Sequence, residues 1–155
     1  MATELVIERV FDAPRELVWK AFTAPDEFAA WFGPVGYSAP RDTVDIDLRV
    51  GGHQRFTMVP DNDDYPPGGT SDRMFEVIVE HELLILHEEP EGEMAELFGS
   101  DRIDLRLEFH DDGGGKTRLV VRHGPYRDDF VGNVREGWAS SFTKLDDLLA
   151  GKRSA

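Results

Sequence analysis

Hydrophobic residues near the C-terminus recur every three or four positions, a spacing typical of one face of an α-helix. Between residues 130 and 149 they are Val131, Val134, Trp138, Phe142, Leu145 and Leu149. Charged residues occupy the opposite face, so the pattern predicts an amphipathic helix about 30 Å long. Gly137 lies in its middle, where glycine costs about 1 kcal/mol relative to alanine. We therefore expect another group to pack closely against Gly137.

The rest of the chain is dominated by strand patterns. In residues 44–49, for example, apolar and charged side chains alternate, as in a strand with one buried face. Seven segments read as strands: 4–11, 44–49, 53–59, 72–80, 83–88, 103–109 and 117–123. Residues 15–23 and 28–32 carry the apolar stripes of two short helices. Because most connections are short, we predict an α+β fold in which a curved antiparallel sheet wraps around the long C-terminal helix.

The size and composition indicate one domain spanning residues 1–155. Its 155 residues are 40% hydrophobic, enough to bury a core. The chain has no cysteine, which excludes disulfides and thiolate nucleophiles. It has neither a signal-peptide pattern nor an apolar run of about 20 residues, so we expect a cytoplasmic protein without membrane insertion.

The charge argues against polyanionic partners. The 17 Lys and Arg residues face 31 Asp and Glu residues, for a net charge of −14. The phosphates of a nucleic acid or an anionic membrane would repel this charge, so we expect neither as a partner. No sequence feature identifies a subunit interface, and homodimerisation stays open.

A curved sheet, one long helix and two short helices tend to leave a space between them, and such a space is the first candidate for a ligand site. Alternation within the strands and periodicity along the helices predict which residues line it. They are Trp31, Phe32, Phe56, Met58, Phe75, Val77, Leu105, Leu107, Trp138 and Phe142. The alternative is that these side chains, the aromatic ones above all, seal the core.

Polar groups inside strands are the candidates for orienting a ligand or for acid–base chemistry. His53 and His87 lie in strands, as do the charged residues Arg55, Arg73, Glu76 and Arg106. Strand alternation places most of them on the wet face, but a single β-bulge reverses that assignment. No histidine pair has metal-ligand spacing, so we expect neither a metal nor a cofactor.

Several segments resemble the heat-shock-protein-90 ATPase activator homology family. They are residues 9–19 (RVFDAPRELVW), 23–25 (TAP), 31–34 (WFGP), 47–52 (DLRVGG), 114–117 (GGKT) and 137–138 (GW). That family belongs to the START-like (SRPBCC) helix-grip superfamily. The resemblance implies a seven-stranded antiparallel sheet that grips the C-terminal helix around a hydrophobic cavity.

The resemblance and the residues together favour a binding protein rather than an enzyme. The first hypothesis is a module that holds a hydrophobic small molecule, such as a lipid, polyketide or aromatic metabolite. The second is an enzyme of the polyketide cyclase or aromatase kind. The third is a stress-response or chaperone-regulating interaction protein. We do not expect chaperone contact like that of the eukaryotic activator, whose separate N-terminal domain does not fit into 155 residues.

Overall fold

A curved antiparallel sheet of seven strands dominates the computed structural model, which describes residues 2–66 and 68–154. Its strands are β1 (Ala2–Phe11), β3 (Asp45–Ile46), β4 (His53–Thr57), β6 (Thr70–Val79), β7 (Leu83–Glu88), β8 (Ile103–Gly113) and β9 (Lys116–Arg127). They pair in the order β1-β9-β8-β7-β6-β4-β3. These are the seven segments predicted from the sequence, and the α+β helix-grip fold is confirmed.

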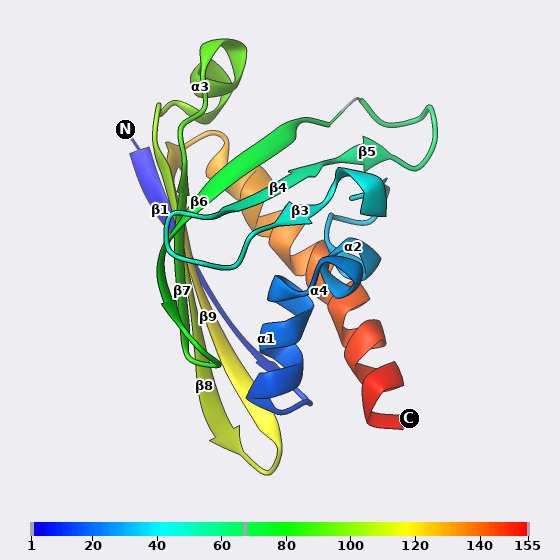
Figure 1. Ribbon diagram of the computed structural model, residues 1–155. Helices are drawn as coiled ribbons and strands as arrows, with labels where there is room; N and C mark the ends of the chain where they lie inside the picture. Colours follow the sequence, from blue (N-terminus) through cyan, green and yellow to red (C-terminus); the bar gives the residue numbers. More distant parts are fainter. Residues whose placement is uncertain (1, 67, 155) are drawn as a thin grey trace.

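The long helix α4 (Val131–Ser154) runs along the concave side of this sheet (Figure 1). Two short helices, α1 (Arg15–Thr23) and α2 (Pro25–Trp31), pack against it, while α3 (Gly92–Phe98) stands at the end of the sheet where α4 begins. A small second sheet joins β2 (Tyr37–Ser38) to β5 (Val59–Pro60), and a 3-10 turn, Arg41–Thr43, precedes β3.

The bracket formed by α1 and α2 follows from its prolines. Pro14 stands at the N-cap of α1, and Pro25 begins α2, where a missing N–H leaves no helical bond unmade. The indole Nε1 of Trp31 then donates to the carbonyl of Ala21 at 2.8 Å. This bond fixes one short helix against the other.

Several boundaries differ from the sequence prediction, and two of these differences have a direct structural cause. The strand expected at 44–49 is reduced to Asp45–Ile46, because the chain turns from Asp47 to Gly52 and a side chain on Gly52 would meet the Asp47 carbonyl at 2.1 Å. At the other end, residues 124–127 extend β9 instead of linking it to the helix. They do so because the start of β1 pairs with them, Ala2 opposite Arg127.

A β-bulge in β6 reverses the expected alternation. The pairing of β6 with β7 shifts between Phe75 and Val77, so that Phe75 lies opposite Leu86 and Ile78 opposite Leu84. Phe75, Leu84 and Leu86 are buried in the core, and Ile78 packs against it. Val77 therefore points to the outer face.

Candidate functional site

A cavity of about 290 Å³ lies between the sheet, α3 and α4. Its buried end is formed by Phe32, Phe56, Arg73, His123 and Trp138, whereas Met94, Phe98 and Phe130 stand nearer the surface. The remaining lining residues are Pro34, Met58, Gly69, Ser71, Val134, Gly137 and Ser141. The lining is mostly apolar with a few polar groups, as in most small-molecule sites.

Four of the ten predicted lining residues border this cavity: Phe32, Phe56, Met58 and Trp138. The other six lie elsewhere. Trp31, Phe75, Leu105, Leu107 and Phe142 are fully packed core residues, each at most 2% exposed. Val77 lies on the outer face because of the bulge in β6. The prediction that these six line the cavity is wrong.

The aromatic core explains why Trp31 and Phe142 do not reach the cavity. The Trp31 ring contacts Phe22 and Phe28 with centroids 5.0 and 6.2 Å away, and Phe142 packs edge-on against Phe11 at 5.2 Å. These rings fill the half of the space between sheet and helices that lies away from α3. The cavity is confined to the half that α3 covers.

Gly137 borders the cavity, contrary to the expectation of close packing. No atom comes within 4 Å of the position its Cβ would take. The missing side chain in the middle of α4 therefore contributes open volume, which accounts for a glycine at a position where helix propensity disfavours it.

Among the described residues, Arg73 is the only charged side chain in the lining. It lies on the inner face of β6 and is 6% exposed. Its Nη1 donates to Gln54 Oε1 at 3.0 Å, and its guanidinium lies 5.1 Å from the centre of the Phe56 ring. Its Nε is buried and has no hydrogen-bond partner among the described residues.

His123 lines the cavity as the centre of a buried hydrogen-bond chain. Trp138 Nε1 donates to His123 Nδ1 at 3.0 Å, and the Tyr126 hydroxyl lies 3.1 Å from His123 Nε2. Burial, with a further effect of the positive charge on Arg73, lowers the pKa of His123 well below its usual value. Because an indole N–H only donates, Nδ1 accepts, and the neutral ring carries its proton on Nε2 and donates it to Tyr126.

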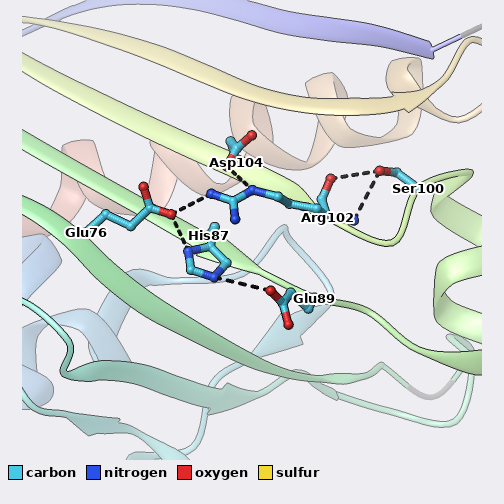
Figure 2. Close-up of polar contacts among 6 residues, drawn as sticks. All are labelled: Glu76, His87, Glu89, Ser100, Arg102 and Asp104. Atoms are coloured by element: carbon cyan, nitrogen blue, oxygen red, sulfur yellow. Dashed lines mark hydrogen bonds and ion pairs between the residues drawn. The ribbon is translucent and has the colours of Figure 1, made fainter.

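The histidines singled out from the sequence are not at this site. His53 lies on the outer face of β4, with Nε2 2.9 Å from Asp45. His87 also lies on the outer face, where its Nδ1 is 2.5 Å from Glu76 Oε1 (Figure 2). Neither histidine lines the cavity, and both lie on the wet face where strand alternation places most of these polar groups.

Figure 2 shows that His87 belongs to a network of surface charges. Arg102 donates to Glu76 at 2.6 Å and to Asp104 at 3.0 Å, and Glu89 lies 3.7 Å from His87. The hydrogen bond to Glu76 raises the pKa of Arg102. Every cation of this network has a carboxylate partner, which suits a role in holding β6, β7 and β8 together.

Among residues 2–66 and 68–154, no three His, Asp or Glu side chains gather as metal ligands. No described helix combines the length and the apolar character needed to cross a membrane.

Sequence reasoning missed the polar end of the cavity. It noted Arg73 as a charged residue within a strand, but it did not single out His123, which stands at the end of a predicted strand. The available signal was strand alternation. His123 is two residues beyond Val121 and four beyond Leu119, both fully buried, so it lies on the same face of the strand as they do. The lining residues on α3 carry no comparable periodic signal.

Comparison with known proteins places the chain in a family. The family model described as "Activator of Hsp90 ATPase homolog 1-like protein" matches residues 12–150. No match was found among functionally curated proteins.

Solved structures share the fold at low identity. A protein from Nitrosomonas europaea is 20% identical with a TM-score of 0.77, over 98% of this chain and 97% of its own. The AHSA1 protein of Silicibacter pomeroyi is 22% identical with a TM-score of 0.77, over 97% of this chain and 99% of its own. CalU16 from Micromonospora echinospora is 21% identical with a TM-score of 0.67, over 99% of this chain and 80% of its own. With the family model covering most of its length, the chain belongs to the Activator of Hsp90 ATPase homolog 1-like family.

Proposed function

We propose that this protein binds a small hydrophobic molecule in the cavity between its sheet and α4. The observation that carries the proposal is the cavity of about 290 Å³, whose lining is mostly aromatic, methionine and other apolar groups. Burial of apolar ligand surface, at about 25 cal/mol per Å², supplies the driving force. Met58 and Met94 suit such a lining because an unbranched thioether adapts to the shape of a ligand.

The same residues give little support to a cyclase-like enzyme. Proton transfer needs a group that can release or accept a proton within reach of the substrate. Both ring nitrogens of His123 are engaged by Trp138 and Tyr126, and no Asp or Glu is found among the described lining residues. An arginine guanidinium is not deprotonated in proteins and so does not serve as the acid or base. We therefore favour binding over catalysis.

A cavity-filling substitution tests the proposal. Gly137→Leu places a side chain at a position on the cavity wall where the added Cβ meets open space, so the new side chain extends into the cavity. The helix gains about 1 kcal/mol in propensity, so the variant should fold at least as well as the parent. We expect its affinity for neutral apolar probes, naphthamide and decanol, to fall at least about tenfold, which corresponds to 1.4 kcal/mol.

Gly132→Leu is the matched control. Gly132 lies on the same helix, is exposed, also has no atom within 4 Å of an added Cβ, and does not line the cavity. Binding is followed by quenching of tryptophan fluorescence, since Trp138 is part of the lining, and by the rise in melting temperature with ligand. Equal probe affinity in Gly137→Leu and Gly132→Leu, or no binding to the parent, contradicts the proposal.

A further inference from the structure

Arg73 presents a buried positive charge to the cavity with no negative charge to match it. No carboxylate of the described residues lies within 4.0 Å of its guanidinium, although all other arginines with described side chains except Arg15 and Arg135 have such a partner. The side chain that accepts a hydrogen bond from Arg73, Gln54, is a neutral amide. The rings of Phe56 and Phe32, at 5.1 and 5.9 Å, give only cation–π contact.

Glu88 is an acidic residue close enough in the sheet to be considered as a partner of Arg73. It follows His87, which pairs with Met74, so it stands on β7 beside the strand that carries Arg73. Glu88 is half-buried and is not part of the cavity lining, although it shares a separate, polar groove with Arg73. It forms no ion pair with Arg73. The positive charge therefore faces the cavity without compensation from the lining.

A guanidinium cannot escape this situation by losing its proton, because arginine side chains are not deprotonated in proteins. An isolated buried charge is strongly unfavourable unless it is paired and hydrogen-bonded. The buried Nε adds a donor without an acceptor. The molecule thus maintains one cation and one free N–H donor at the inner end of an apolar cavity, and an anionic group on a bound molecule satisfies both.

We infer that the ligand of this cavity is an apolar molecule with a single carboxylate, which the Arg73 guanidinium binds. This inference rests on the proposed function and adds the chemical class of the ligand. Arginine suits a carboxylate because its planar fork offers two parallel N–H donors. The hydroxyls of Ser71 and Ser141 are the other polar groups of the lining available to the head group.

The charge count favours a carboxylate over a phosphate. Arg73 provides one positive charge, and no other Lys or Arg with a described side chain lines the cavity. A dianionic phosphate would retain one uncompensated charge in an apolar environment, which is costly. A monoanion cancels the charge of Arg73, and the apolar body of the same ligand occupies the space between Phe32, Phe56 and Trp138.

The test compares two probes of nearly equal shape, naphthoate and its neutral amide naphthamide, at neutral pH. Their affinities are measured by tryptophan quenching and by calorimetry. We expect the parent protein to bind naphthoate about ten- to a hundredfold more tightly than naphthamide, the range for hydrogen bonds to charged groups. Equal affinities, or a preference for the amide, overturn the inference.

Two variants remove the cation in different ways. Arg73→Met deletes it and keeps the apolar stem. Gln54→Glu leaves Arg73 in place but puts a carboxylate where the Gln54 oxygen now accepts at 3.0 Å, so the site is internally neutralised. Both variants should lose the preference for naphthoate while still binding naphthamide. Persistence of the preference in either folded variant overturns the inference.

Two controls isolate the position of the charge. Arg55→Met removes a positive charge from the outer face of the neighbouring strand β4, where Arg55 pairs with Asp72 at 3.1 Å. Glu88→Gln removes the nearby acid. Both should keep the preference for naphthoate, and its loss in Arg55→Met would mean that overall charge, not Arg73, sets it.

The outcomes separate the two proposals. Naphthamide binding that Gly137→Leu weakens, without any carboxylate preference, supports the apolar cavity and overturns only the role of Arg73. Failure of both probes to bind the parent overturns both proposals. Naphthoate binding that depends on Arg73 and on an open cavity supports both.

Discussion

At the scale of single residues, the hydrogen-bond chain Trp138–His123–Tyr126 determines the protonation state of His123 at the buried end of the cavity. The indole N–H determines which histidine nitrogen accepts, and burial keeps the ring neutral. A protonated His123 would place a second cation in the cavity and would lose the bond from Trp138, since both ring nitrogens would then donate. The His123 ring is therefore a polar but uncharged part of the cavity lining, held in place by its two hydrogen bonds.

This neutrality predicts a pH dependence of stability. The pKa of His123 is lowered by folding, so below about pH 6.5, the usual value for histidine, the unfolded chain binds a proton that the folded protein excludes. The contribution is fully present above that pH and is lost as the pH falls, by up to about 1.4 kcal/mol per pH unit.

Urea unfolding measures this effect in the parent and in His123→Gln. It is followed from about pH 7 to about pH 5, on either side of the usual histidine pKa. The glutamine variant should be less stable at neutral pH because two buried hydrogen bonds change. Its stability should nevertheless fall less steeply toward acid than that of the parent. Parallel curves for the two proteins would contradict the assignment of a neutral His123.

At the scale of elements, the bulge in β6 determines which side chains the sheet turns inward. Strict alternation along residues 72–80 places Arg73, Phe75 and Val77 on one face, and this is correct for the first two residues only. The extra residue at the bulge exchanges Val77 for Ile78 on the core side. Sequence periodicity identifies the strand but not the interruption, because the bulge depends on pairing with β7.

The exchange predicts unequal effects of threonine at neighbouring positions. Ile78→Thr removes apolar contact with the core and buries a hydroxyl, so it should destabilise the protein by about 1–3 kcal/mol. Val77→Thr is isosteric, faces outward and keeps a β-branched residue in the strand, so its effect should stay within about 0.5 kcal/mol. Chemical denaturation measures both, and a larger loss for Val77→Thr would refute the bulge.

At the scale of the whole molecule, the surface and the cavity carry opposite charge. The chain has a net charge of −14, while the one charged residue of the lining is an arginine. A carboxylate ligand must approach a strongly negative molecule before it reaches its counter-charge. Long-range repulsion acts on the approach, whereas contact with Arg73 acts on the bound state.

This arrangement predicts a salt effect on association rate. Raising the ionic strength from about 0.01 to 0.15 M shortens the screening length from about 30 to 8 Å. Naphthoate should then associate faster, because repulsion by the net charge is screened, while the rate for naphthamide should stay constant. Stopped-flow tryptophan quenching measures both rates, and a naphthoate rate that falls with added salt would contradict this account.

Local patterns in the sequence were sufficient for the elements and the fold. The apolar spacing of residues 130–149, the alternation in the strands and the prolines of the bracket are properties of short segments. Most of these segments fold as their own periodicity predicts, and the exception is 44–49, where only Asp45–Ile46 forms a strand. The family resemblance rests on such segments too. Four cavity residues were predicted from the same patterns. Phe56 and Trp138 lie within β4 and α4, whereas Phe32 is the C-cap of α2 and Met58 lies between β4 and β5.

The position and chemistry of the cavity required the tertiary structure. Whether Trp31 or Phe32 meets open space depends on how α1, α2 and α4 pack, and whether Val77 or Ile78 faces inward depends on a bulge set by a second strand. Arg73 looks in the sequence like any other strand arginine. Only the assembled fold shows that it is buried without a carboxylate, since burial and pairing are relations between residues distant in the chain.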